Sequence, residues 1–141
     1  MRHSTNSEEE TIALGETLAR SLPARAVVML IGNLGTGKTT LAKGIVKGLQ
    51  AAQPEEVSSP TFTLIHEYGG GPRTVYHIDL YRLDNEREAA TLGLEEIFDR
   101  EAVTLIEWGE RFPNLMPPSR VEIRLQHAGG DHRIIEVTGI D

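Results

Sequence analysis

The sequence predicts an α/β fold, in which helices cover a mixed, mainly parallel central sheet that also includes antiparallel hairpins. Three observations support this prediction. Short apolar runs without charge, at 26–31 and 103–106, are typical of strands buried on both faces. Segments with helical spacing of apolar residues are interleaved with these strands. Two pairs of alternating segments, each joined by a glycine-bearing turn, are typical of β-hairpins.

Composition points to a globular protein. The chain has 141 residues, of which 39% are hydrophobic and 25% charged. We expect residues 1–7 to form a disordered lead and residues 8–141 to form a single domain. No apolar run approaches the roughly 20 residues that span a bilayer, so we expect a cytoplasmic protein without a membrane partner. The formal charge of −7 argues against unaided binding to nucleic acid, and the absence of cysteine excludes disulfides and thiolate metal sites.

The first half of the chain alternates between helix and strand. Apolar residues on one helical face, preceded by three glutamates, predict a helix over 8–22 that Pro23 ends. The apolar run predicts a strand over 26–31. Apolar residues at every fourth position then predict a helix over 37–49, followed by a polar loop over 50–59.

The second half is expected to contain two hairpins, a helical segment and one further buried strand. The first hairpin pairs a strand within 58–68 with a strand over 74–78. One or two short helices follow over 86–99, with a break at Gly93, and then a strand over 103–106 and a proline-bearing loop over 111–119. The second hairpin pairs 121–126 with 133–137.

The most specific motif follows the first predicted strand. Gly32-Asn33-Leu34-Gly35-Thr36-Gly37-Lys38-Thr39 fits G-x-x-x-x-G-K-[ST], the pattern of a phosphate-binding loop. Its glycines let main-chain amides approach an anion, and the helix N-terminus that follows favours negative charge. Lys38 can reach the outer phosphates, Thr39 can ligate Mg²⁺ and Thr40 can bond an inner phosphate. Strand, loop and helix together predict a P-loop NTPase-like three-layer sandwich.

Two acids end apolar strands and are candidates for the metal or for the attacking water. Asp79 closes the strand 74–78 and Glu107 closes the strand 103–106. Ligands of such sheets bind at the carboxyl ends of the strands, which would bring both acids to the loop. The alternatives are a turn cap for Asp79 and a solvent-facing acid for Glu107.

Other residues are less specific. Thr61 and Thr63 follow the first helix–loop unit, where such proteins sense the γ-phosphate, but ordinary strand threonines are equally compatible with the pattern. Trp108 is either a core anchor or a residue near the nucleotide or a partner. The histidines, including His77, lack metal-ligand spacing and are expected to be solvated or in the core. No Asn-Lys-x-Asp element is present, which favours ATP over GTP.

Together with the glycine loop, four further motifs resemble the TsaE (YjeE) family, the small ATPase of bacterial tRNA threonylcarbamoyladenosine synthesis. The likeness runs from about Glu8 to Val137. The motifs are Ser-Pro-Thr-Phe-Thr-Leu at 59–64, His-Ile-Asp-Leu-Tyr-Arg-Leu at 77–83, Leu-Gly-Leu-Glu-Glu at 92–96 and Ile-Glu-Trp at 106–108.

The resemblance implies a function in a complex. TsaE works with the TsaB–TsaD pair, in which TsaD transfers threonylcarbamoyl to N6 of adenosine 37 in tRNAs that read codons starting with A. By resemblance, the chain binds and hydrolyses ATP with Mg²⁺, which supports repeated rounds of modification, and meets tRNA only through its partners.

The resemblance also implies roles for particular positions. The ATP-binding residues would be Thr11, Asn33, Leu34, Gly35, Thr36, Gly37, Lys38, Thr39, Thr40 and Arg133. Thr39, Glu107 and Asp79 would bind or organise the metal, and Lys38, Glu107, Asp79 and the switch residue Thr61 would serve catalysis. Two positions depart from the family pattern: Asn33 stands where the family usually has Asp, and Thr36 where Ala is common. If that Asp has a catalytic role, Asn33, which has no carboxylate, would weaken hydrolysis here.

Two other functions are compatible with the glycine loop. One is an independent small-molecule kinase, although the chain leaves no room after the core for a large acceptor domain or lid. The other is a non-catalytic module that assembles in an ATP-dependent way.

Overall fold

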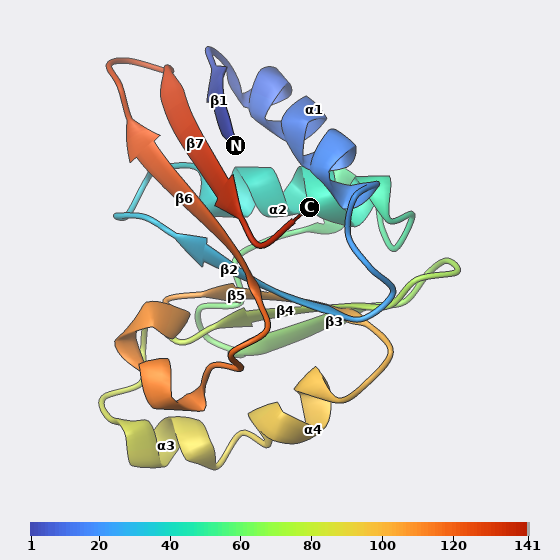
Figure 1. Ribbon diagram of the computed structural model, residues 1–141, viewed down its shortest axis with the longest axis vertical. Coiled ribbons are helices and arrows are strands. Elements are labelled where there is room, and N and C mark those ends of the chain that lie inside the picture. Colours follow the sequence, from blue (N-terminus) through green and yellow to red (C-terminus); the bar gives the residue numbers. More distant parts are fainter. Residues whose placement is uncertain (141) are drawn as a thin grey trace.

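The computed structural model describes residues 1–140 and contains one seven-stranded sheet with helices on both faces (Figure 1). The strands are β1 (Arg2–Thr5), β2 (Ala26–Ile31), β3 (Ile65–Tyr68), β4 (Val75–Asp79), β5 (Val103–Glu107), β6 (Val121–His127) and β7 (Arg133–Thr138). The helices are α1 (Glu8–Ala19), α2 (Lys38–Gly48), α3 (Glu86–Ala90) and α4 (Leu94–Phe98). Short 3₁₀ turns are η1 (Pro54–Glu56), η2 (Gly109–Arg111) and η3 (Pro113–Leu115).

The sheet has the order β1-β7-β6-β2-β5-β4-β3. Its four central strands, β6, β2, β5 and β4, run parallel, whereas β3, β7 and β1 are antiparallel to their neighbours. The predicted α/β fold with a mixed sheet is therefore confirmed, and both predicted hairpins are present. The parallel centre matters for function because it brings the carboxyl ends of β2, β4 and β5 to one edge.

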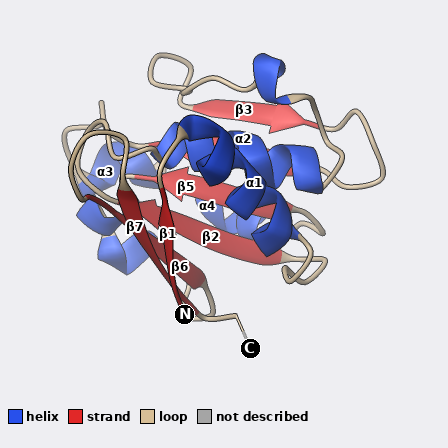
Figure 2. Cartoon of the chain, turned by 90° about the horizontal axis from the view of Figure 1, so that it is seen from above, coloured by secondary structure: helices blue, strands red, loops and turns tan. Residues whose placement is uncertain are grey.

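Two hydrophobic layers follow from the alternation of side chains along the strands. In β2, Val28 and Leu30 pack with α1 and α2, whereas Val27 and Met29 pack with α3, α4 and the 3₁₀ turns. Figure 2 shows α1 and α2 in front of the sheet and α3 and α4 behind it. Because β2 is covered on both faces, its run of apolar residues has no polar interruption.

The two helices above the sheet cross closely at a pair of glycines. A Cβ built on Gly15 would lie 2.6 Å from the Leu41 carbonyl oxygen, and one built on Gly44 would collide with the Ile12 carbonyl. Neither position can carry a side chain without a shift of the helices. The close crossing fixes α2, whose first turn carries the lysine and threonine of the glycine loop.

The expectation of a disordered lead at 1–7 is wrong. Residues 2–5 form β1, which pairs with β7, and the Met1 amino group donates to the Val137 carbonyl at 3.0 Å. The physical reason is a non-local pairing, because β7 lies at the other end of the chain and supplies hydrogen bonds that the local sequence does not announce. Ser7 caps α1 by accepting from the Glu10 amide.

Several boundaries also differ from the sequence-based expectation. Helix α1 ends at Ala19 rather than at residue 22, and β3 is confined to residues 65–68. Leu64 precedes β3 in the left-handed region, with φ of 70°, so the segment before it turns instead of extending. The break at Gly93 is confirmed, since this glycine has φ of 72° and is the N-cap of α4. Within residues 1–140 no helix is long and apolar enough to cross a membrane.

Candidate functional site

The glycine loop, residues 32–39, joins β2 to α2 and folds back on itself. Gly37 precedes the first residue of α2 with φ of 100°, a conformation that a side chain would strain. A Cβ on Gly32 would lie 2.6 Å from the Thr36 hydroxyl and 2.7 Å from the Leu125 carbonyl oxygen. The loop therefore depends on glycine at these points, and it ends at the amide-rich N-terminus of α2.

A cleft of about 540 Å³ opens beside this loop. It brings together residues from the loop, from α2, from the segment before β3, and from the carboxyl ends of β4 and β5. Its lining includes Lys38, Thr39, Thr40, Thr61, Asp79, Glu107, Trp108 and Arg133, together with Leu34, Gly35 and Gly37. Residues far apart in the sequence, from Leu34 in the loop to Arg133 in the last hairpin, thus meet in a single cleft.

The Lys38 side chain is held inside the glycine loop by a main-chain carbonyl and an aromatic ring. Its Nζ donates to the Gly32 carbonyl at 2.7 Å and lies 3.6 Å from the centre of the Trp108 ring. Only 5% of this residue is exposed, and burial lowers the pKa of its amine, an effect that the carboxylates of Glu107, Glu110 and Asp79 partly oppose. Trp108 is thus both a packing residue and part of the cleft wall, so neither of its two sequence-based alternatives excludes the other.

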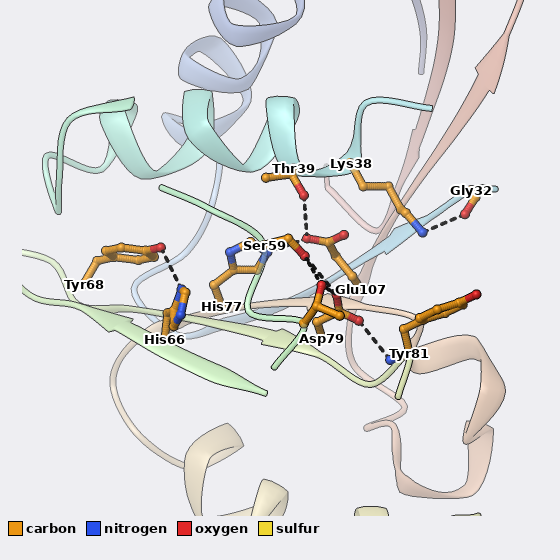
Figure 3. Close-up of polar contacts among 11 residues, drawn as sticks. Gly32, Lys38, Thr39, Ser59, His66, Tyr68, His77, Asp79, Tyr81 and Glu107 are labelled. Atoms are coloured by element: carbon orange, nitrogen blue, oxygen red, sulfur yellow. Dashed lines mark hydrogen bonds and ion pairs between the residues drawn. The ribbon is translucent and has the colours of Figure 1, made fainter. Parts of the chain in front are cut away.

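Glu107 ends β5 with its carboxylate under the first turn of α2 (Figure 3). The residue is 3% exposed, which argues against a solvent-facing acid. Its Oε2 accepts from the Thr39 hydroxyl at 3.2 Å and lies 2.6 Å from Nε2 of His77. A carboxylate and a hydroxyl are thus adjacent at the point where the loop becomes α2.

Asp79 ends β4 directly opposite Glu107 in the parallel register. Its Oδ2 accepts from the hydroxyls of Ser59 at 3.0 Å and Thr61 at 3.2 Å, and its Oδ1 accepts from the Tyr81 amide at 2.9 Å. Asp79 therefore does cap a turn, and it also ties the segment before β3 to the cleft. Thr63 is exposed and does not line the cleft.

The residues assigned only by resemblance lie around the loop. The Arg133 guanidinium donates to the Thr36 carbonyl at 3.2 Å and to the Gly35 carbonyl at 3.5 Å, so the last hairpin supports the glycine loop. Thr11 is buried and its hydroxyl contacts that of Thr5 at 2.8 Å. It borders a small hollow of about 50 Å³ that also touches Gly37, Thr40 and Arg133.

Thr36 and Asn33, the two positions that depart from the family pattern, do not line the main cleft. Thr36 is buried, and its hydroxyl donates to the Asn33 carbonyl at 2.8 Å inside the loop. Asn33 lines a separate hollow with residues of β6 and is not part of the main cleft wall. In this structure neither side chain is directed to the cleft, although the main chain of both belongs to the loop.

Sequence reasoning missed the environment of His77. The sequence predicts a histidine that is solvated or in the core. His77 is fully buried in the core, and its Nε2 contacts Glu107, a contact that the sequence does not predict. A signal was available, because the two-residue period of a strand places His77 and Asp79 on the same face of β4. The contact itself depends on the register between β4 and β5, which no local pattern provides.

The oxygen atoms at this site suit a hard cation such as Mg²⁺, which keeps most of its water and phosphate ligands when a protein binds it. Residues 1–140 contain no group of three or more His, Asp or Glu side chains that could hold a metal by themselves. Mg²⁺ is commonly bound by one or two protein oxygens together with waters and phosphates. The adjacent oxygens of Thr39 and Glu107 fit that requirement, and so does the anion-binding loop beside them.

Comparison with known proteins assigns the family. The family model described as "Threonylcarbamoyl adenosine biosynthesis protein TsaE" matches residues 5–135. The tRNA threonylcarbamoyladenosine biosynthesis protein TsaE of Bacillus subtilis is 40% identical over 136 residues, which cover 96% of this chain and 84% of the relative. The chain belongs to the TsaE family.

Other TsaE proteins cover the chain equally well. The protein of that name from Treponema pallidum is 38% identical over 137 residues, covering 97% of this chain and 99% of the relative. A crystal structure of Bacillus subtilis YdiB superposes with a TM-score of 0.82 at 34% identity, covering 100% of this chain and 86% of that one. The TsaE family takes part in tRNA threonylcarbamoyladenosine biosynthesis, and the resemblance drawn from the motifs is thereby confirmed.

Proposed function

We propose that this TsaE-family chain binds ATP with Mg²⁺ in the cleft beside the glycine loop and hydrolyses it in support of a TsaB–TsaD pair. The observation that carries the proposal is the convergence of Lys38, Thr39, Asp79 and Glu107 on one cleft. A lysine and a helix N-terminus provide an anion site, and two carboxylates with a hydroxyl provide a metal and water site.

Phosphate binding is assigned to the loop amides between Asn33 and Thr40 and to Lys38. The Lys38 amine is within the loop and bonded to the Gly32 carbonyl, so a phosphate oxygen would take over a donor that is already in place. Because only 5% of the residue is exposed, its charge acts on phosphate with little screening by water. Leu34, Gly35, Thr36 and Gly37 contribute main-chain amides, which explains why Thr36 can replace a smaller residue.

Thr39 and Glu107 would hold Mg²⁺, which when bound neutralises charge on the phosphate oxygens. Asp79 is the second carboxylate, available to organise a water or the hydration of the metal. Thr61 is bonded to Asp79 and can exchange that bond for one to the γ-phosphate, the behaviour of a switch residue. Thr11 and Arg133 border the nucleotide, Arg133 by supporting the loop carbonyls.

A partner is part of the proposal because the chain offers little for tRNA. Its net charge of −7 opposes contact with a phosphate backbone, so tRNA would be met through TsaB–TsaD. Relatives that cover nearly the whole chain are described as tRNA threonylcarbamoyladenosine biosynthesis proteins, which supports the same pathway.

The test is reconstitution of tRNA modification with TsaB–TsaD. With Lys38→Ala, modified tRNA should stop at about one round per complex, whereas Lys43→Ala, on the same helix but outside the cleft lining, should sustain many rounds. Undiminished multi-round modification with Lys38→Ala would contradict the proposal. A phosphorylated metabolite formed without partners would favour a kinase, and full activity of Glu107→Gln would favour a non-catalytic assembly module.

A further inference from the structure

The register of β4 and β5 places a histidine directly behind the candidate metal acid. Asp79 is opposite Glu107, so His77 is opposite Leu105 and reaches Glu107 diagonally, one step along the same face. The result is a contact of 2.6 Å between Nε2 of His77 and Oε2 of Glu107 (Figure 3). His77 lines no part of the cleft and cannot touch a ligand there.

In the part of the chain that the structure describes, the ring of His77 makes one polar contact. It is fully buried, and within residues 1–140 its Nδ1 has no hydrogen-bond partner. A buried nitrogen without a partner destabilises a fold, and an apolar side chain of similar volume would avoid that loss. Glu107 is therefore the one polar partner of the ring among the described residues, which directs attention to what this contact does for the carboxylate.

Glu107 needs such a contact because it is itself buried. Its rotamer is defined by two contacts to the same oxygen, one from Thr39 in the first turn of α2 and one from His77 in the parallel part of the sheet. Because both contacts are to Oε2, Oε1 remains available to a cation in the cleft. Residues that orient a metal ligand in this way raise the affinity of the site without touching the metal.

We propose that His77 is a positioning residue that holds the Glu107 carboxylate in the orientation that accepts the divalent cation. The inference rests on the proposed function, because it assumes that Glu107 serves a nucleotide-bound cation. His77 acts through Glu107 and takes no part in the reaction itself. Its loss should weaken binding of the cation to the nucleotide complex more than binding of the nucleotide.

The experiment is a titration of the ADP complex with Mn²⁺, followed by electron paramagnetic resonance, with ADP affinity measured separately in EDTA by calorimetry. His77→Met and His77→Gln form a matched pair of similar volume, in which only glutamine retains a donor for Glu107. His66→Leu is the control, since His66 is paired with His77 across β3 and β4 but bonds to Tyr68 instead. Thermal unfolding is recorded for every variant.

We expect His77→Met to weaken Mn²⁺ binding about 10-fold or more, the range seen when such supporting contacts are removed. His77→Gln should recover most of that loss, and His66→Leu should show none. In the Glu107→Gln background, His77→Met should have no further effect on Mn²⁺ binding, because its target is gone.

Three results would overturn the inference. These are wild-type Mn²⁺ affinity in His77→Met, equal losses in the methionine and glutamine variants, and an additive loss on top of Glu107→Gln. If His77→Met does not fold, His77→Leu, which likewise lacks a donor, takes its place. Failure of the proposed function is distinguishable, because the wild-type chain would then bind no ADP.

Discussion

Trp108 gives a prediction whose magnitude can be worked from the structure. The Lys38 amine lies 3.6 Å from the centre of its ring, and Tyr81 packs against it with ring centroids 5.1 Å apart. A desolvated cation–π contact contributes about 2 kcal/mol and an aromatic pair about 0.5–1.5 kcal/mol. Trp108→Ala should therefore lower the free energy of unfolding by about 2.5–3.5 kcal/mol, or roughly 10 °C in a chain of this size.

The matched variant is Trp108→Phe, which keeps an aromatic face. Position 108 has φ of 66°, and both variants carry the same backbone strain there, so their difference reports the side chain. Because Trp108 is the only tryptophan, urea unfolding is followed by circular dichroism. A double-mutant cycle of Trp108→Ala with Lys38→Met should give a coupling of about 0.5–2 kcal/mol. Coupling near zero, or equal losses in Trp108→Phe and Trp108→Ala, would refute the reasoning.

Two further predictions concern the hydroxyl contacts of Asp79 and the partly buried carboxyl group of Glu110. The double variant Ser59→Ala, Thr61→Val removes both hydroxyls that bond to Asp79, and it should accelerate amide hydrogen exchange in the segment before β3. The control Thr63→Val changes an exposed threonine and should leave the exchange rate unchanged. Unchanged exchange in the double variant would show that the hydroxyl contacts do not hold the segment. Burial raises the pKa of Glu110 above its ordinary 4.5, so its contribution to stability is present below that value and is lost as pH rises through the folded-state pKa. Glu110→Gln should therefore be more stable than wild type at pH 7, by urea denaturation, and the advantage should shrink as the pH falls through the folded-state pKa toward 4.5. A difference that stays constant over this range would contradict the assignment.

The parts of the fold that were predictable are those specified locally. The strand 26–31, the loop after it and the start of α2 follow from an uninterrupted apolar run, a glycine motif and a fourth-residue period. The acids Asp79 and Glu107 could be placed at one edge because parallel strands share a carboxyl end. Gly93 could be placed between two short helices because its positive φ is a conformation that favours glycine.

What the sequence could not provide depends on partners far away in the chain. Residues 2–5 look polar and unstructured because their hydrogen bonds come from β7. The contact of His77 with Glu107 depends on how two strands are aligned, and the support of Gly35 and Thr36 by Arg133 depends on how the last hairpin packs. Each of these is a tertiary contact, whereas sequence patterns report the period and ends of single elements.

The most direct test of the account is a crystal structure of the chain with a non-hydrolysable ATP analogue and Mg²⁺. We predict that the outer phosphates lie on the amides between Asn33 and Thr39, and that the Lys38 amine moves from the Gly32 carbonyl to a phosphate oxygen. We also predict a metal ion that contacts Thr39 and faces Glu107. A nucleotide bound elsewhere with the glycine loop empty, or a metal distant from Glu107, would contradict it.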